Sequence, residues 1–227
     1  MSAGLGVSAV LFDAYGTLLD VTGIVAAEAP DLGAAAEALS TLWRRKQLEY
    51  SWLRTLMRRH ADFAQVTADA LDHSLEALGL GHEDRRERLL AAYRRLPAFP
   101  EAAAVLRTLR RHGLRTAVLS NGSPDMLADG LAAAGLADLL DEVLSAESVG
   151  LFKPAPEVYH LGTSRLGLAA GAIAFLSSNA WDVHGAASFG LTTIWVNRYG
   201  VPDERLPGAP VLTIPSLEPL PGVLGCA

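Results

Sequence analysis

The sequence predicts an α/β protein, with a doubly wound parallel sheet and a helical subdomain inserted after the first strand. Two observations carry this prediction. From residue 101 onward, short β-prone runs alternate with segments of helical period. Between residues 23 and 96, by contrast, no strand candidate occurs and the apolar residues follow helical spacing. We therefore expect a core formed by residues 1–19 and 98–227 and an inserted cap subdomain at 20–97. A chain of 227 residues, 50% of them hydrophobic, is long enough to bury such a core.

The first part of the chain holds one predicted strand and three predicted helices. The strand covers residues 7–12, and Tyr15-Gly16-Thr17 after Asp13 is a turn signal. The helices are expected at 34–60, 69–78 and 83–96. In the first of them, Lys46 and Gln47 interrupt the apolar stripe at positions where the period calls for apolar residues.

The second part alternates regularly. Strands are expected at 114–119, 142–145, 173–177, 192–196 and 211–214, and helices at 101–112, 125–134, 156–166 and 182–189. Gly113, Gly135 and Gly190 stand where helices end. In such sheets the crossovers are right-handed, and ligands bind beyond the carboxyl ends of the strands.

Composition excludes several classes of function. The net charge of −6 argues against nucleic acid or an anionic membrane surface as a partner, and no apolar run approaches a membrane span. The N-terminus lacks a basic segment typical of a signal peptide, and the single cysteine, Cys226, cannot form an intrachain disulfide. We therefore expect a soluble, cytoplasmic protein. It has 17 arginines but only two lysines, one of them Lys153.

Polar side chains follow several of the predicted strands. Asp13 follows the first strand, Ser120-Asn121 the second and Ser177-Ser178-Asn179 a later one, with Asp182 just inside the next helix. Lys153 lies in the loop after the short strand at 142–145. Because parallel strands end at one edge of the sheet, these groups should meet there. Each of them alone is a weak signal, and their joint occurrence is a strong one.

Four strings resemble the motifs of the haloacid dehalogenase superfamily: Phe12-Asp13-Ala14-Tyr15-Gly16-Thr17-Leu18, Ser120-Asn121-Gly122, Lys153-Pro154 and Ser177-Ser178-Asn179-Ala180-Trp181-Asp182. Residues 20–97 correspond to the helical cap of that superfamily. Two long strings, Trp43-Arg44-Arg45-Lys46-Gln47-Leu48-Glu49-Tyr50-Ser51-Trp52-Leu53 and Ser178-Asn179-Ala180-Trp181-Asp182, resemble the 2-haloacid dehalogenases in particular.

Most relatives in this superfamily are phosphohydrolases, so a phosphatase is the first alternative. Such phosphatases carry a second Asp two residues after the nucleophile, because a leaving alkoxide needs a proton, and here that position is Tyr15. They also hold Mg²⁺ with the nucleophile and two acids of the last motif, and here the first of those acids is Ser178. A halide leaves unprotonated. Both substitutions therefore favour dehalogenation over the phosphatase. A small-carboxylate binder without catalysis is the second alternative.

The resemblance implies catalytic roles for six residues. Asp13 would attack the sp³ carbon in line with the carbon–halogen bond, giving an ester and halide with inversion. Lys153 would offset the charges of the two acids and of the substrate carboxylate. Asp182 would orient Lys153 and activate the water that hydrolyses the ester. The supporting groups would be Asn179, Ser177 and Thr17.

The resemblance also implies a substrate site. Ser120 would hold the substrate carboxylate. Arg44 and Asn121 would surround the departing halide, since a guanidinium suits a large, weakly hydrated anion. An aromatic side chain, Phe63 or Trp181, would line the same space. Four further residues line the pocket or pack in the core, and the sequence does not separate the two: Tyr15, Gln47, Leu48 and Tyr159.

The expected partners are a small (S)-2-haloalkanoate and halide. No cofactor and no metal ion are expected. The six histidines show no zinc-binding spacing, and no segment resembles a P-loop or a dinucleotide-binding fingerprint. His184 is expected on a helix surface. The family resemblance implies a homodimer that forms through the cap.

Overall fold

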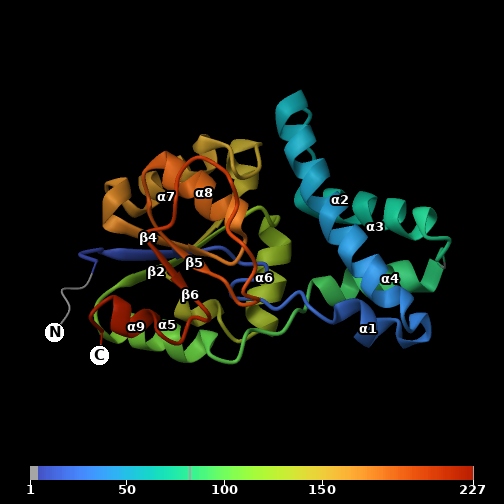
Figure 1. The fold of residues 1–227 in the computed structure, drawn as a ribbon, viewed down its shortest axis with the longest axis horizontal. Helices are drawn as coiled ribbons and strands as arrows, with labels where there is room; N and C mark the ends of the chain where they lie inside the picture. The colour runs from blue at the N-terminus through green and yellow to red at the C-terminus, as the bar shows by residue number, and fades with distance from the viewer. Residues whose placement is uncertain (1–4, 82, 227) are drawn as a thin grey trace.

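A six-stranded parallel sheet with helices on both faces forms the centre of the computed structural model, which describes residues 5–81 and 83–226 (Figure 1). The strands are β1 (Ala9–Phe12), β2 (Arg115–Ser120), β3 (Glu142–Ser145), β4 (Ile173–Ser177), β5 (Thr192–Val196) and β6 (Leu212–Ile214). Their order is β3-β2-β1-β4-β5-β6. The chain therefore adds strands on one side of β1 and then returns to build the other side, so the topological switch lies between β1 and β4. This confirms the predicted doubly wound sheet.

Helices cover both faces of the sheet. In Figure 1, α7 (Pro156–Leu166) and α8 (Ala180–Phe189) lie above it, and α5 (Ala102–Arg111) and α9 (Leu220–Val223) lie below it. Strands β1 and β4 are buried along their whole length, as expected for central parallel strands. The helices that follow β2 or precede it outside the insertion are α5 (Ala102–Arg111), α6 (Pro124–Ala133), α7 (Pro156–Leu166), α8 (Ala180–Phe189) and α9 (Leu220–Val223). The described part of the chain also contains four 3₁₀ turns, at Pro30–Leu32, Ala137–Leu139, Ala146–Val149 and Ala170–Ala172.

The helices between β1 and β2 form a separate group beside the sheet (Figure 1). We call them the insertion helices: α1 (Ile24–Glu28), α2 (Ala35–Met57), α3 (Phe63–Ala77) and α4 (Glu83–Tyr93). Helix α1 was not predicted, because five residues are too few to show a period. Helix α3 begins six residues before its predicted start. The side chain of Asp62 accepts a hydrogen bond from the Gln65 backbone N–H at 2.7 Å and so caps this helix.

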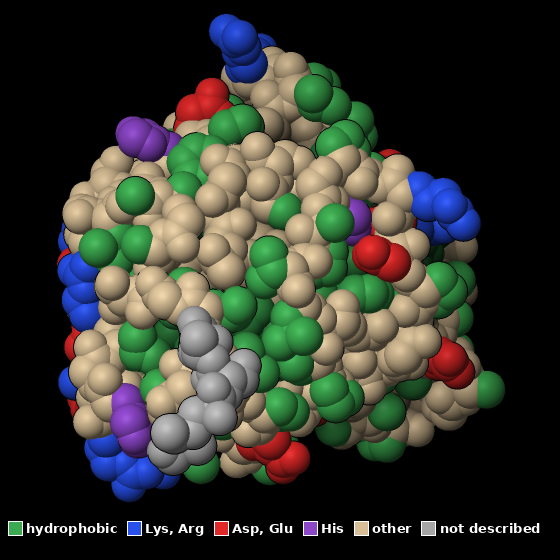
Figure 2. All heavy atoms as spheres, turned by 60° about the vertical axis from the view of Figure 1, so that its left-hand side comes forward, with side chains coloured by type: hydrophobic (Ala, Val, Ile, Leu, Met, Phe, Trp, Pro, Cys, Tyr) green, Lys and Arg blue, Asp and Glu red, His purple; other side chains and the backbone are tan. Residues whose placement is uncertain are grey.

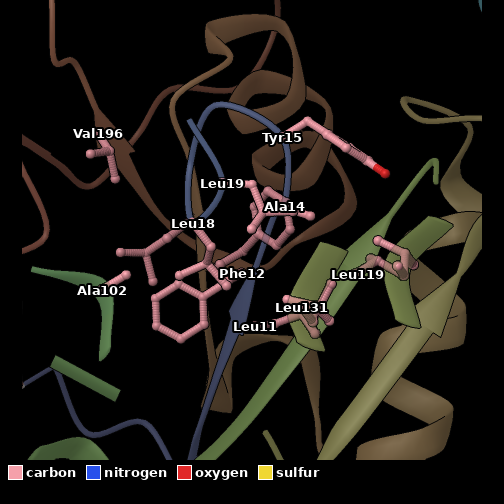
Figure 3. Close-up of a cluster of buried hydrophobic side chains, with 14 of the residues drawn as sticks. Leu11, Phe12, Ala14, Tyr15, Leu18, Leu19, Ala102, Leu119, Leu131 and Val196 are labelled. Atoms are coloured by element: carbon pink, nitrogen blue, oxygen red, sulfur yellow. The ribbon is translucent and has the colours of Figure 1, made fainter. Parts of the chain in front are cut away.

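The loop after β1 is fixed by its own backbone and by burial. The Gly16 N–H donates to the Leu19 carbonyl at 2.7 Å. Phe12 and Leu18 are fully buried and point to the opposite side of the loop from Tyr15 (Figure 3). Gly16 has φ +87°, and a Cβ there would lie 2.9 Å from Ser178 Oγ. A side chain at this position would therefore have a strained backbone and would crowd Ser178, which follows β4.

Arg198 braces the two linkers that join the sheet to the insertion helices. Its guanidinium donates to Glu101 at 2.7 Å and to the Thr17 carbonyl at 2.9 Å. It also lies over the Phe99 ring, 3.5 Å from the ring centroid. Between the linkers, the Asp20 N–H donates to the Pro97 carbonyl at 2.8 Å. The loop after β1 and the linkers thus form one connected unit.

On the face in Figure 2, basic and acidic side chains of the described residues are scattered and intermixed, mostly toward the edge, and neither charge is concentrated. In the described part of the chain, no helix is both long enough and apolar enough to span a membrane.

Candidate active site

The carboxyl ends of three neighbouring strands bring the predicted groups together. Strand β1 pairs with β2 on one side and with β4 on the other. Asp13 follows β1, and its N–H still donates to the Leu176 carbonyl of β4 at 2.8 Å. Ser120 ends β2 and Ser177 ends β4. The strand register therefore sets the distance between these side chains.

Three charged groups meet below the surface at this edge. Lys153 Nζ lies 2.8 Å from Asp182 Oδ2 and 3.3 Å from Asp13 Oδ1. All three side chains are buried, and the ammonium also lies 4.8 Å from the centroid of the Phe175 ring. The cluster carries two carboxylates and one cation, so Lys153 attracts both acids and offsets part of their negative charge.

Asp182 is held by two donors. Tyr159 Oη donates to Asp182 Oδ1 at 2.8 Å, and Lys153 binds the other oxygen. Burial raises the pKa of Asp182 to about 6, against the opposing effect of Lys153. Burial raises the pKa of Tyr159 as well, so its hydroxyl stays protonated and remains a donor. The sequence had left Tyr159 undecided between pocket and core. An aromatic residue on a buried helix face gives no signal for this bond.

One oxygen of Asp13 is held by several neutral donors. Asp13 Oδ2 accepts from Asn179 Nδ2 at 2.9 Å and from the hydroxyls of Ser177 and Thr17 at 3.2 Å each. The other oxygen, Oδ1, has only the longer contact with Lys153. The carboxylate is therefore fixed in orientation through Oδ2, while Oδ1 remains the less engaged oxygen.

Arg44 connects the insertion helices to the sheet edge. Its Nη2 donates to Asn179 Oδ1 at 3.3 Å, and its Nη1 donates to Gln47 Oε1 at 2.6 Å. Asn179 thus lies between Arg44 and Asp13, with its amide oxygen toward one and its amide nitrogen toward the other. The sequence alone places Arg44 on helix α2, and only the family resemblance placed it near Asp13.

A small cavity lies at the centre of these contacts. It is lined by Asp13, Tyr15, Arg44, Leu48, Phe63, Ser120, Asn121, Lys153, Asn179 and Trp181. The structure therefore brings Ser120, Arg44 and Asn121 together with both candidate aromatic residues. Tyr15 and Leu48, which the sequence does not assign to pocket or core, line the same cavity. Thr17, Ser177 and Asp182 do not line the cavity, but Thr17 and Ser177 donate to Asp13, and Asp182 pairs with Lys153. A larger cavity of about 450 Å³ lies between α2 and the first linker and also reaches Arg44.

Two polar residues after β2 have their partners set by the backbone. Ser120 Oγ accepts from the Gly122 N–H at 3.1 Å, which leaves the hydroxyl proton of Ser120 available for an anion. Asn121 Oδ1 accepts from the Lys153 N–H at 2.8 Å, which leaves the amide nitrogen of Asn121 free to donate. Both side chains are buried.

The site does not fit a magnesium ion of the kind that phosphatases of this fold use. Such an ion needs several oxygen acceptors, and the oxygens of Asp13 face an ammonium, an amide N–H and two hydroxyls that donate to them. Ser178 stands at the position of an acid. Among residues 5–81 and 83–226, no cluster of three or more His, Cys, Asp or Glu side chains could hold a metal. These residues therefore do not supply the acidic oxygen ligands that Mg²⁺ needs.

His184 was expected on a helix surface, and this expectation was wrong. The ring is buried between α8 and the loop before β6. Nδ1 lies 3.3 Å from the Pro207 carbonyl and Nε2 lies 3.0 Å from Asp203 Oδ1. These acceptors raise the pKa of His184 in spite of its burial. The ring fastens this loop to α8 and does not contact the cavity.

The comparisons with known proteins agree with this geometry. The haloacid dehalogenase-like hydrolase family matches residues 7–190. The chain belongs to this family. It is 46% identical over 219 residues to (S)-2-haloacid dehalogenase 1 of Pseudomonas sp. (strain CBS-3), which covers 96% of each chain. It is 48% identical over 199 residues to (S)-2-haloacid dehalogenase 4A of Burkholderia cepacia, covering 86% of this chain and 85% of that one.

Solved structures of the haloacid dehalogenase-like hydrolases show the same fold. A dehalogenase with an intermediate complex superposes with a TM-score of 0.94 at 44% identity, covering 96% of this chain and 97% of that one. The L-2-haloacid dehalogenase of Xanthobacter autotrophicus with chloropropionic acid covalently bound gives 0.90 at 38% identity, covering 96% and 98%. These relatives are named as dehalogenases, and this chain shares their family and their fold.

Proposed function

We propose that this hydrolase is an (S)-2-haloacid dehalogenase, which converts an (S)-2-haloalkanoate and water into the (R)-2-hydroxyalkanoate, halide and a proton. The observation that carries the proposal is the Asp13 carboxylate beside Lys153, with Tyr15 in place of a general acid and donors in place of metal ligands. This arrangement suits a leaving group that needs no proton and a substrate that carries a single negative charge. The relatives named above, of similar length, support the same activity.

In the first step, Asp13 Oδ1 attacks C2 of the substrate opposite the halogen. The new O–C2 bond forms as the C2–halogen bond breaks, and the electron pair of that bond leaves with the halide. Oδ1 is the oxygen that Asn179, Ser177 and Thr17 leave less engaged. Ser120 would hold the substrate carboxylate, and Arg44 with Asn121 would surround the halide. Holding the two reactants in line could supply roughly 7–11 kcal/mol of the barrier.

In the second step, water attacks Cγ of Asp13 and the Cγ–Oδ1 bond breaks. The alkoxide leaves with the oxygen that Asp13 contributed and takes a proton of the water back from Asp182 to give the hydroxy acid. The oxygen of water stays on Asp13, and the second proton of water is released. The pKa of about 6 keeps Asp182 ionised at neutral pH, so Asp182 can hold Lys153 in place and accept the proton of the attacking water. Lys153 would steady the charge throughout both steps.

The domain organisation and the assembly are part of the proposal. We propose that residues 20–97 act as a cap over a core of residues 1–19 and 98–227, because Arg44 and Phe63 reach the cavity from the insertion helices. We also propose a homodimer through this cap. The end of α2 carries Leu56, which is 79% exposed, and Met57, which is 60% exposed, and a second copy could cover these side chains. Light scattering after gel filtration measures the mass in solution, which should be twice the 24.0 kDa of one chain if the protein is a dimer.

Halide release from the two enantiomers of 2-chloropropionate, with and without EDTA, tests the proposed activity. We expect chloride from the (S) enantiomer at a rate that EDTA does not change, and negligible phosphate release from p-nitrophenyl phosphate with Mg²⁺ present. Faster, metal-dependent phosphate release would assign the protein to the phosphatases. Thermal stabilisation by 2-chloropropionate without any chloride release would indicate a carboxylate-binding protein.

A further inference from the structure

Gln47 is a polar residue in the middle of the apolar stripe of α2, and its side chain is 1% exposed. A buried amide is costly unless its groups find partners. Here they do. Gln47 Oε1 accepts from Arg44 Nη1 at 2.6 Å and from Tyr93 Oη at 3.2 Å, and Gln47 Nε2 donates to Thr67 Oγ1 at 2.8 Å. The Gln47 amide therefore links three insertion helices, α2, α3 and α4, through hydrogen bonds that include one from the Arg44 guanidinium.

The hydrogen bonds around this amide have only one consistent direction. Thr67 has a single hydroxyl proton and donates it to the Phe63 carbonyl at 2.6 Å. Thr67 must therefore accept from Gln47, which turns the amide nitrogen of Gln47 toward α3 and its oxygen toward Arg44. Tyr93 donates to the same oxygen. The orientation that Arg44 needs is thus imposed from α3, a helix 20 residues away in the sequence.

The partners of Arg44 are both neutral. Its guanidinium donates to the amide oxygens of Gln47 and Asn179, and no described carboxylate forms an ion pair with it. Other arginines of the chain are paired with acids. Examples are Arg54 with Asp69 at 2.9 Å, Arg94 with Asp129 at 2.6 Å and Arg198 with Glu101 at 2.7 Å. Amide oxygens fix the position of the Arg44 guanidinium without neutralising its positive charge. A carboxylate in the same place would neutralise it.

We infer that Gln47 is a positioning residue that directs the guanidinium of Arg44 toward the leaving halide while keeping its positive charge uncompensated. This inference rests on the proposed function, because it assigns a purpose to the same site. Gln47 contacts neither the substrate nor the reacting atoms. Its effect should therefore appear in halide affinity and in sensitivity to the leaving group, and it should not appear in binding of the substrate carboxylate.

The variant Gln47→Glu keeps the size of the side chain and adds the charge that the structure avoids. We expect this variant to be folded, because its carboxylate still accepts from Arg44 and Tyr93. The inhibition constant for bromide should rise about tenfold or more, and single-turnover dehalogenation should slow by a similar factor. Lys46→Gln is the matched control. It changes the net charge by the same amount on the same helix, and Lys46 pairs with Glu49 instead of Arg44. This control should behave like the wild type.

A second pair of variants tests the hydrogen bonds from Thr67 through Gln47 to Arg44 without changing the net charge. Thr67→Val removes the hydroxyl that orients Gln47, and Thr67→Ser keeps it. We expect Thr67→Val to lower kcat with little change in KM, and to slow chloro-substrates more than bromo-substrates because chloride is the poorer leaving group. Thr67→Ser should restore both properties. A loss caused only by poorer packing would lower the melting temperature without changing the ratio of chloro to bromo rates.

The inference is overturned if Gln47→Glu keeps wild-type bromide inhibition and wild-type single-turnover rates. If that variant does not fold, an unchanged chloro-to-bromo ratio in Thr67→Val overturns it instead. Failure of the proposed function has a different signature. In that case the wild-type protein itself releases no chloride from (S)-2-chloropropionate, and the comparison of variants does not arise.

Discussion

The ammonium of Lys153 lies 2.8 Å from Asp182 Oδ2, and both side chains are closed off from solvent. Asp182 lies at the start of α8, and Lys153 lies in the loop before α7. The same ammonium is 3.3 Å from Asp13. One cation therefore serves two carboxylates in a place that water does not screen, which makes it the electrostatic centre of the site.

Replacing Lys153 should remove most of the activity. The Lys153→Ala variant leaves two buried acids without a counter-charge, so we expect a loss of about 10²–10³-fold or more in kcat together with a lower melting temperature. Lys153→Arg should restore little, because a planar guanidinium does not fit the space of a compact ammonium. Chloride release and circular dichroism measure the two effects. A folded Lys153→Ala enzyme with nearly wild-type rates would contradict the role of Lys153.

The pH dependence of kcat should follow Asp182. Its pKa of about 6 predicts that kcat rises as the pH increases through about 6, when the carboxylate forms. Stability should respond in the opposite sense. A carboxyl pKa raised on folding contributes stability below the unfolded value of about 3.9, and this contribution is lost as the pH rises through about 6.

The Tyr159→Phe variant removes a hydrogen-bond donor that favours the ionised form of Asp182. Its kcat profile should therefore shift to higher pH, and an unmoved or lowered profile would contradict this assignment.

The absence of a side chain at Gly185 leaves room for the Tyr159 hydroxyl to reach Asp182. A Cβ on Gly185 would lie 2.6 Å from Tyr159 Oη and 2.6 Å from Pro154 Cβ, so Gly185→Ala should cost about 1–3 kcal/mol and displace the hydroxyl that binds Asp182. Gly162→Ala is the control, because its Cβ would lie 2.7 Å from Leu11 Cδ2, in the core. Both variants should be less stable, as measured by urea unfolding. Only Gly185→Ala should change the pH profile of kcat, and equal profiles would refute this link.

Glu147 should hold the insertion helices against the sheet. It accepts from the Phe63 N–H at the start of α3 at 2.9 Å and lies 2.7 Å from His60 Nε2. Glu147→Ala should lower stability by about 1–2 kcal/mol and raise KM, because Phe63 lines the cavity. Glu147→Gln should recover part of the loss, since its amide oxygen can still accept from Phe63. As a control, Glu142→Ala removes a surface pair with Arg165 and should leave KM unchanged. An unaltered KM in Glu147→Ala would contradict the prediction.

The sheet and its polar edge could be predicted because both depend on local patterns. Apolar runs set the strands, and parallel strands ending in Asp13, Ser120 and Ser177 must bring these residues to one edge. The start of α3 was missed although a local signal existed, since Asp62 followed by Gln65 three residues later is a capping pattern.

The remaining contacts of the site join residues far apart in the sequence. The bond from Tyr159 to Asp182 and the bond from Gln47 to Thr67 link different helices, and each of these residues is equally compatible with ordinary core packing when judged from its neighbours. The position of Arg44 near Asn179 depends on how the insertion helices dock. No period or motif spacing encodes that docking, so only the family resemblance indicated it.

Single-turnover hydrolysis in H₂¹⁸O tests the central claim, that Asp13 itself attacks carbon. With enzyme in excess over (S)-2-chloropropionate, the account predicts that the hydroxyl oxygen of the product is unlabelled. The label should instead appear on the peptide that contains Asp13, because water attacks Cγ of the ester. Net inversion at C2 is common to both routes and cannot separate them. Labelled hydroxy acid in the first turnover, with no label on Asp13, would show that the carboxylate acts only as a general base and would contradict the account.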